Sequence, residues 1–230
     1  MRRRIYLLRH AEVSYFLPDG TPLRPAEAPL TAEGRTQAEA ARDALQGFGI
    51  SHAVTSGLPR TVETARIVLT GRSVSVREER AFEEVSPGKI AEIPKEKAES
   101  VFTRAFDPAD PAGARFLGGE SFADFGARVL PAWTALLEEP SWETLLLVAH
   151  GGVNRVILAH CLGSDFHSFG HLEQDPACIN ILDVDTGRGS PRVLVRAVNV
   201  TPYNPLKRGL QETTMERLYK QYAKRWKEKG

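Results

Sequence analysis

The amino-acid sequence predicts an α/β protein, built as a three-layer α/β/α sandwich around a mostly parallel central sheet. Short apolar runs of strand length alternate with helical patterns along the chain, which is the order that produces parallel sheets. The runs at residues 5–8 and 144–149 are apolar almost throughout, as strands buried on both faces are. A length of 230 residues suits one core with a modest insertion, so we expect a single domain over residues 1–230.

The first part of the chain contains three expected strands and two expected helices. The strand at residues 5–8 ends on Arg9 and His10. Thr31 is placed to cap a helix that runs to about residue 46. The elements that follow are a strand at 52–55, a helix at about 58–69 and a short strand at 74–76. This alternation supports the α/β class.

Regular periodicity weakens between about residues 81 and 120, where four prolines interrupt the chain and one short helical pattern covers 95–105. We interpret this region as an inserted lid. A helix is expected from Ser121 to about residue 138, and Pro131 inside it predicts either a kink or two segments. The later elements are a strand at 144–149, a helix at about 153–162, a hairpin of strands at 179–184 and 193–200, and a basic C-terminal helix at about 211–228 with an apolar stripe.

The overall charge and the cysteine content exclude several classes of function. Thirty basic and twenty-nine acidic side chains leave a net charge of +1, so no general positive field would attract nucleic acid or an anionic membrane. Two cysteines cannot form a disulfide framework, and no apolar run approaches the roughly 20 residues of a membrane-spanning helix. No secretory signal pattern precedes the first strand. We therefore expect a cytoplasmic protein with neither nucleic acid nor a membrane as partner.

Two histidines occupy the same kind of position, directly after an apolar strand. His10 and His150 each precede a small residue at the carboxyl end of the strand, which is the edge where open α/β sheets bind ligands. Arg9 stands beside the first histidine, and Arg60 lies at the beginning of the helix that follows the second strand. Guanidinium groups and helix N-termini both bind phosphate oxygens. The sequence therefore predicts an anion-binding site that contains two imidazoles.

A metal site is the other common use of histidines. Neither His10 nor His150 has a second histidine or a carboxylate at a usual ligand spacing, and Glu12 is expected to point away from the first strand's exit. We therefore expect no metal and no other cofactor. The remaining histidines are interpreted as structural: His52, His160, His167 and His171.

Five motifs, taken together and in order, make the chain resemble the histidine phosphatase superfamily, the phosphoglycerate-mutase-like enzymes. They span residues 4 to about 160 and are highly specific as a set. The resemblance implies the phosphoglycerate-mutase-like fold for the whole sandwich. The motifs are Leu8-Arg9-His10-Ala11-Glu12, Thr55-Ser56-Gly57-Leu58-Pro59-Arg60-Thr61, Glu84 followed by Gly88, Gly118-Gly119-Glu120-Ser121, and Ala149-His150-Gly151-Gly152.

The resemblance also implies roles for the residues that match. His10 corresponds to the histidine that becomes phosphorylated, and a neutral imidazole is a competent nucleophile for phosphorus. Arg9, Arg60 and His150 correspond to the residues that bind the phosphoryl group. Their charges would compensate the equatorial oxygens of an in-line transition state, so no metal is needed.

The proton donor is expected at Glu84. Adjacent Glu83 stays open as the alternative, because only the spacing to Gly88 favours Glu84. Gly151 is expected beside the phosphate as part of the last motif. Ser14 is a candidate for a secondary phosphate contact, because the positions around it carry apolar side chains where many relatives have a hydroxyl or an amide.

The implied function is metal-independent hydrolysis of small phosphate monoesters through a phosphohistidine. Two alternatives stay open: a cofactor-dependent phosphoglycerate mutase and a catalytically idle phosphate-binding module. The lid favours the phosphatase, because it lacks adjacent arginines and because its aromatic content predicts a substrate with an apolar or aromatic portion. A small phosphorylated substrate is the expected partner, and a homodimer through the C-terminal helix is a further option. The aromatic residues concerned are Phe102, Phe106, Phe116 and Phe122.

Overall fold

Helices and strands alternate along the protein as the sequence predicts. A computed structural model describes residues 2–17, 23–107, 113–187 and 191–228. Within these ranges the elements are β1 (Arg2–Arg9), α1 (Ala32–Ala44), β2 (His52–Thr55), α2 (Pro59–Val68), β3 (Val76–Glu78), α3 (Lys95–Thr103), α4 (Phe122–Glu138), β4 (Thr144–Ala149), α5 (Gly151–Leu162), β5 (Ile179–Asp185), β6 (Arg192–Val200) and α6 (Thr214–Glu228).

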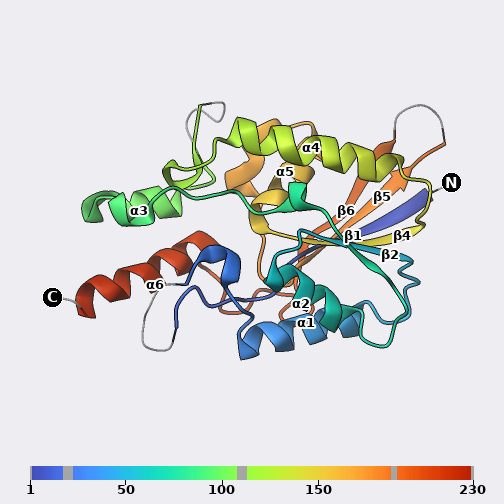
Figure 1. The fold of residues 1–230 in the computed structure, drawn as a ribbon, viewed down its shortest axis with the longest axis horizontal. Helices are drawn as coiled ribbons and strands as arrows, with labels where there is room; N and C mark the ends of the chain where they lie inside the picture. The colour runs from blue at the N-terminus through green and yellow to red at the C-terminus, as the bar shows by residue number, and fades with distance from the viewer. Residues whose placement is uncertain (1, 18–22, 108–112, 188–190, 229–230) are drawn as a thin grey trace.

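A mixed, mostly parallel sheet forms the middle layer (Figure 1). Among the described residues its strand order is β3-β2-β4-β1-β5-β6, with β1 to β4 parallel and with β5 antiparallel to both of its neighbours. The register pairs Arg9 with Ala149 and Thr55 with Val148. The carboxyl ends of β1, β2 and β4 therefore lie side by side, and the segments that follow them leave the sheet at one edge.

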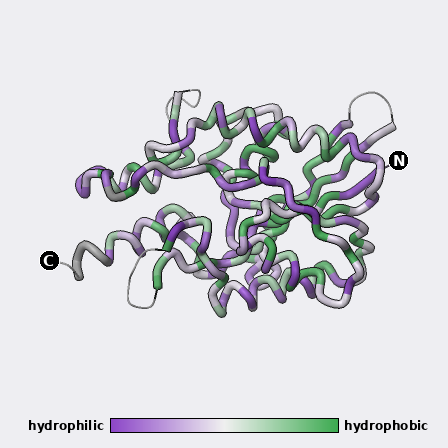
Figure 2. The backbone as a smooth tube through the Cα atoms, in the orientation of Figure 1, coloured by the Kyte–Doolittle hydropathy of each residue, from purple (hydrophilic) through white to green (hydrophobic). Residues whose placement is uncertain are grey.

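Helices cover both faces of the sheet, which completes the predicted three layers (Figure 1). Side chains alternate along a strand, so Tyr6 and Leu8 of β1 pack in the core with residues of α1 and α2, while Ile5 and Leu7 pack in the core with residues of α4 and α5. Hydrophobic segments accordingly gather around the central strands in Figure 2. Among the described residues, no helix is long and apolar enough to cross a membrane.

The helix predicted from Ser121 is continuous rather than divided at its proline. The Ser121 hydroxyl caps the helix by accepting a hydrogen bond from the amide of Asp124 at 3.0 Å. Pro131 lies inside α4, which runs through it as one element of 17 residues. Burial of Val129 and Trp133 on the same side of the helix offsets the hydrogen bond that the proline removes.

Two predicted boundaries are wrong by a few residues. The strand expected at 74–76 is β3, which lies at Val76–Glu78. Its position follows from its pairing with β2, which begins at Val76, rather than from the local Val-Ser-Val alternation. The C-terminal helix begins at Thr214 rather than near residue 211, because Thr213 and Glu216 cap its first turn through reciprocal hydrogen bonds. The hairpin of β5 and β6 is confirmed.

The aromatic side chains predicted for the lid pack into the main hydrophobic core, in the same cluster as Ile5 and Leu7 of β1. Phe102, Phe106, Phe116 and Phe122 are all buried, and Phe106 lies 5.0 Å from Phe116 between ring centroids. Phe122 in turn packs edge-on against Phe169 at 5.4 Å. Because these rings are buried in the core, they give no support to a substrate with an apolar or aromatic portion, and that substrate class stays a prediction.

Candidate active site

Four side chains predicted from distant parts of the sequence come together at the carboxyl edge of the sheet. Arg9 ends β1 and His10 follows it, Arg60 is the second residue of α2, and His150 is the N-cap of α5. Their exposed fractions are 9%, 2%, 3% and 0% respectively. The two imidazole rings lie 5.2 Å apart between centroids, in an edge-on arrangement. We refer to these four residues as the histidine-arginine cluster.

The hydrogen bonding of His10 determines which of its ring nitrogens is free. Nδ1 lies 2.8 Å from the backbone oxygen of Ala11, and because a carbonyl only accepts, Nδ1 carries the proton. The neutral ring therefore has its lone pair on Nε2. Burial lowers the pKa of His10 well below its ordinary value, and the positive charges of Arg60 and Arg9 lower it further. At neutral pH, Nε2 is an unprotonated nucleophile.

The two arginines are held in the same way. Arg9 donates through Nη1 to the backbone oxygen of Gln174, and Arg60 donates through Nη1 to that of Pro25 at 2.8 Å. In each guanidinium the Nε atom is buried and has no hydrogen-bond partner among the described residues. Buried donors without a partner are rare in proteins, because each costs about 1–3 kcal/mol. Two such donors beside His10 indicate a site for an acceptor that carries negative charge.

His150 contributes a third buried nitrogen without a described partner, its Nδ1. Its Nε2 lies 2.8 Å from the Ser56 hydroxyl, which lies 3.0 Å from that of Thr61. Since Thr61 donates its proton to the backbone oxygen of Leu58 at 2.8 Å, Ser56 donates to Thr61 and accepts from Nε2 of His150. Burial and then the charge of Arg60 lower the pKa of His150 well below its ordinary value. The neutral ring thus presents the lone pair of Nδ1.

Ser56 has no role in the sequence-based prediction, although it lies in one of the five motifs. The signal that could have identified it is its position: it follows β2 directly, at the same sheet edge as His10 and His150.

Glu84 lies beside the cluster, at the N-terminus of α5. Both of its carboxylate oxygens accept from the amide of Gly152 at 3.1 Å, and one of them also accepts from the amide of Val85 at 3.0 Å. Glu83 is instead paired with Arg80 at 3.8 Å, and its side chain is 40% exposed. Of the two carboxylates that the sequence leaves open, the structure brings Glu84 to the site.

Arg128, an arginine outside the histidine-arginine cluster, holds the segment that carries Glu84. Arg128 of α4 donates through Nη1 to the backbone oxygens of Ala81 and Glu83, both at 2.8 Å, and through Nη2 to that of Glu84 at 3.2 Å. It is also paired with Glu120 at 3.0 Å. Sequence reasoning missed Arg128, because nothing in its local pattern on a helix shows that it reaches a segment about 45 residues earlier.

The remaining predicted residues differ in where they lie. Gly151 packs against the cluster: a Cβ atom there would lie 3.2 Å from Nη1 of Arg155 and 3.5 Å from Nε of Arg9. Ser14 does not join the cluster through any described hydrogen bond. Its hydroxyl donates to the backbone oxygen of Phe16 at 2.6 Å and accepts from the amide of the same residue at 3.3 Å, so it closes a local turn. A phosphate contact by Ser14 stays a prediction.

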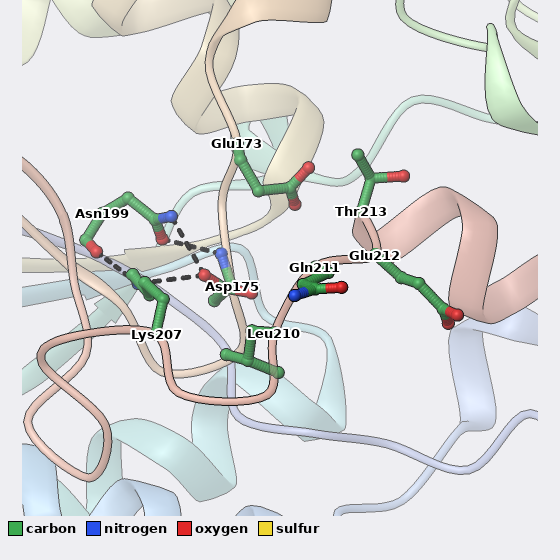
Figure 3. A pocket seen from close by; sticks show the side chains of 8 residues that line it. All are labelled: Glu173, Asp175, Asn199, Lys207, Leu210, Gln211, Glu212 and Thr213. Atoms are coloured by element: carbon green, nitrogen blue, oxygen red, sulfur yellow. Dashed lines mark hydrogen bonds and ion pairs between the residues drawn. The ribbon is translucent and has the colours of Figure 1, made fainter.

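A cavity of about 220 Å³ has no histidine among the residues that line it, and two of these residues flank Gln174, whose backbone oxygen accepts from Arg9. Figure 3 shows its polar walls. Among the described residues, no group of three or more His, Cys, Asp or Glu side chains is arranged to hold a metal ion. The unpartnered nitrogens make the histidine-arginine cluster, rather than this cavity, the candidate active site. The residues that line the cavity are Glu173, Asp175, Asn199, Lys207, Leu210, Gln211, Glu212 and Thr213.

Known proteins resemble this chain over most of its length. It is 29% identical over 205 residues to the adenosylcobalamin/alpha-ribazole phosphatase of Escherichia coli (strain K12), covering 86% of this chain and 98% of that protein. It is 30% identical over 166 residues to a probable phosphoglycerate mutase of Yersinia enterocolitica, covering 71% and 77%. A mycobacterial glucosyl-3-phosphoglycerate phosphatase superposes with a TM-score of 0.69 at 25% identity, over 86% of this chain and 99% of that one.

These relatives include several phosphatases, and their fold is the one that the sequence predicts. The model of the histidine phosphatase superfamily (branch 1) matches residues 5–197, which include all five motifs and every residue of the histidine-arginine cluster. The chain belongs to the histidine phosphatase superfamily.

Proposed function

We propose that this protein hydrolyses small phosphate monoesters through a phosphohistidine on His10, with Glu84 as the proton donor. One observation carries the proposal: Nε of Arg9, Nε of Arg60 and Nδ1 of His150 are buried without a described partner in the cluster that contains His10. A phosphoryl group supplies several acceptor oxygens and enough negative charge to pair with both guanidiniums and with Nδ1 once that atom is protonated. A neutral ligand would leave two cations uncompensated.

In the first step, the lone pair on Nε2 of His10 attacks phosphorus, and the bond from phosphorus to the ester oxygen breaks. The protonated Glu84 carboxyl gives its proton to the departing oxygen, which leaves as an alcohol. The arginines bind the equatorial oxygens, whose charge the transition state spreads. Nδ1 of His150 takes up a proton from solvent as the phosphoryl dianion binds, because the dianion favours the cationic ring, and it then donates to an oxygen.

In the second step, water attacks phosphorus on the face opposite His10. The Glu84 carboxylate accepts one proton of that water, the bond between phosphorus and Nε2 breaks, and inorganic phosphate leaves. As phosphate leaves, Nδ1 of His150 returns its proton to solvent. Glu84 is then protonated and His10 carries its lone pair on Nε2 again, so the cycle is closed. The step needs no metal or redox partner.

A phosphoglycerate mutase is the second candidate, since one relative carries that name. A mutase would keep a bisphosphate bound at the phosphohistidine stage, whereas a phosphatase admits water at that stage. Two observations favour hydrolysis: the lid sequence has no adjacent arginine pair to grip a second anionic group, and the relatives include phosphatases. The direct test supplies 3-phosphoglycerate with 2,3-bisphosphoglycerate. Rapid formation of 2-phosphoglycerate would replace the proposed activity by mutase activity.

The phosphatase proposal is tested by release of p-nitrophenol from p-nitrophenyl phosphate, with and without a chelator. We expect release that is insensitive to chelator, lost in His10→Ala and retained in His160→Ala, a matched change at an exposed histidine of α5. An acid-labile, base-stable phosphoenzyme should be trapped with the unaltered protein and not with His10→Ala. Phosphate binding without release from any ester would indicate the idle module, and loss of release with chelator would contradict the mechanism.

A further inference from the structure

The segment after residue 197 lies outside the match to the superfamily, yet it returns to the active site. Tyr203 donates through its hydroxyl to the backbone oxygen of Pro176 at 2.8 Å. Lys207 and Arg217 pair with opposite oxygens of buried Asp175, at 2.9 and 3.0 Å. These contacts attach the segment to residues 173–178, the stretch that supports Arg9 from behind.

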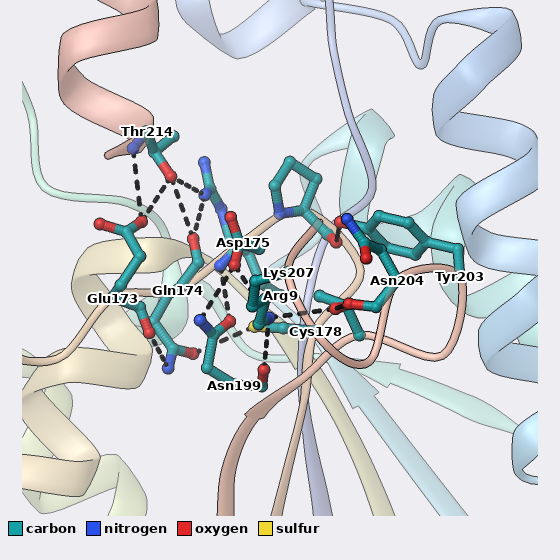
Figure 4. Close-up of polar contacts among 12 residues, drawn as sticks. Arg9, Glu173, Gln174, Asp175, Cys178, Asn199, Tyr203, Asn204, Lys207 and Thr214 are labelled. Carbon is teal, nitrogen blue, oxygen red and sulfur yellow. Dashed lines mark hydrogen bonds and ion pairs between the residues drawn. The ribbon is translucent and has the colours of Figure 1, made fainter. Parts of the chain in front are cut away.

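The first residue of α6 makes direct contact with Arg9. Nη1 of Arg9 donates to the Thr214 hydroxyl at 3.1 Å, and that hydroxyl donates to Oε1 of Glu173 at 2.6 Å (Figure 4). Two hydrogen bonds therefore link the guanidinium of Arg9 to the carboxylate of Glu173 through the Thr214 hydroxyl. Glu173 also pairs with Arg155 at 3.4 Å, so the same carboxylate compensates a second buried arginine next to the cluster.

The contact with Thr214 determines the orientation of the guanidinium. Nη1 has two protons, one for the backbone oxygen of Gln174 and one for Thr214. With both acceptors in place, the two hydrogen bonds from Nη1 set the orientation of the guanidinium plane. The Nε atom then lies against Gly151 at the N-terminus of α5. With Gln174 alone, the plane could pivot about a single hydrogen bond. A planar fork binds phosphate well only when its orientation is set in advance.

Thr214 is not a loose helix end, because α6 is held from Met215 to Tyr222. Met215 is buried in the main core. Further along, Tyr222 stacks on Phe102 of the lid helix α3, with 5.3 Å between ring centroids, and its hydroxyl donates to the backbone oxygen of Ile90 at 3.3 Å. The lid and the core thus fix the position from which Thr214 reaches Arg9.

We propose that Thr214 is a positioning residue for phosphoryl transfer: its hydroxyl holds Arg9 so that the Nε edge faces the phosphoryl group. The C-terminal segment, which the superfamily match does not cover, is then part of the active site rather than an appended helix. The inference rests on the proposed function, since it needs Arg9 to bind the phosphoryl group.

The test uses Thr214→Val, which keeps the shape of the side chain and removes the hydroxyl, and Thr214→Ser, which keeps the hydroxyl. Thr213→Val is the matched control, because Thr213 forms a reciprocal cap with Glu216 at the start of α6 and does not contact Arg9 through any described hydrogen bond. All are measured in the full chain for kcat/KM on phosphate esters with good and poor leaving groups, and for affinity toward inorganic phosphate by calorimetry.

We expect Thr214→Val to lose roughly tenfold to a hundredfold in kcat/KM on every ester, the range for a hydrogen bond to a charged group, with a parallel loss of phosphate affinity. The loss should not depend on the leaving group, because Arg9 holds the part that all esters share. Thr214→Ser should restore most of it. Unchanged phosphate affinity in Thr214→Val, or an equal loss in Thr213→Val, would overturn the inference while leaving the hydrolase intact. If the unaltered protein neither binds phosphate nor hydrolyses esters, both proposals fall together.

Discussion

Replacing Gly152 by alanine would displace Glu84 while leaving the histidine-arginine cluster in place. A Cβ atom at position 152 would lie 2.4 Å from Oε1 of Glu84, and an ordinary contact is about 1 Å longer. The same atom would lie 3.3 Å from the ring of Phe125, which is fully buried and cannot retreat. The carboxylate is the end of a flexible side chain, so it is the group that moves.

The size of the effect follows from that distance. A displacement of about 1 Å in a catalytic group costs on the order of a hundredfold in rate, or about 2.7 kcal/mol in the barrier. We expect this loss in kcat/KM on an alkyl phosphate, whose leaving oxygen needs the proton. The loss on p-nitrophenyl phosphate should be several times smaller, because nitrophenolate leaves without protonation. Phosphate affinity should stay close to that of the unaltered protein.

The assay compares kcat/KM, which reports the step in which the leaving group departs, on the two esters for Gly152→Ala, for Glu84→Gln and for Gly187→Ala. The last variant makes the same chemical change where no atom lies within 4 Å of the new methyl group, so it should behave as the unaltered protein does. Glu84→Gln should show the same dependence on leaving group as Gly152→Ala. If Gly152→Ala slows both esters equally, or neither, Glu84 is not the group that protonates the leaving oxygen.

Three further predictions concern the buried groups. Folding lowers the pKa of His10 and His150, so the free energy of unfolding is highest above about pH 6.5 and falls as the pH drops below it, by up to about 1.4 kcal/mol per pH unit for each ring. Urea unfolding between pH 7 and 5 measures this dependence. His10→Asn should make the free energy of unfolding depend less steeply on pH. Sulfate, which takes up no proton itself, should bind more tightly at pH 6 than at pH 8 because Nδ1 of His150 is protonated on binding, and calorimetry showing equal affinities would contradict that proton uptake. Phe122→Ala should destabilise the fold by about 3–5 kcal/mol without changing the preference between phenyl and alkyl phosphates, whereas a selective loss on phenyl phosphate would place the ring against the substrate.

Much of the site could be predicted from the sequence because the end of each strand can be recognised locally, and the strand ends together locate the site. Each apolar run shows where a strand ends, and parallel strands end at one edge of a sheet. The order of the motifs then indicates which residues meet there, and His10, Arg60 and His150 do meet. Caps are similarly legible, since Thr31 and Ser121 both accept from the first turn of the helix that they precede.

Only the tertiary structure could decide which side chains support these residues, because each support crosses a large sequence separation. Arg128 reaches the Glu84 segment from a helix about 45 residues away, and Thr214 reaches Arg9 across 205 residues. The choice between Glu83 and Glu84 is of the same kind, since both have the same local pattern and only the approach of Gly152 separates them.

The sequence by itself therefore determined the fold class, the edge at which the chemistry lies, and the imidazoles and guanidiniums that gather there. The tertiary structure alone decided that the lid phenylalanines pack into the main core, that Nε of Arg9, Nε of Arg60 and Nδ1 of His150 have no described partner, and that the Thr214 hydroxyl accepts a hydrogen bond from Arg9. The reason is physical: propensity and periodicity act over a few residues, whereas burial and hydrogen-bond partners depend on which distant surfaces pack together.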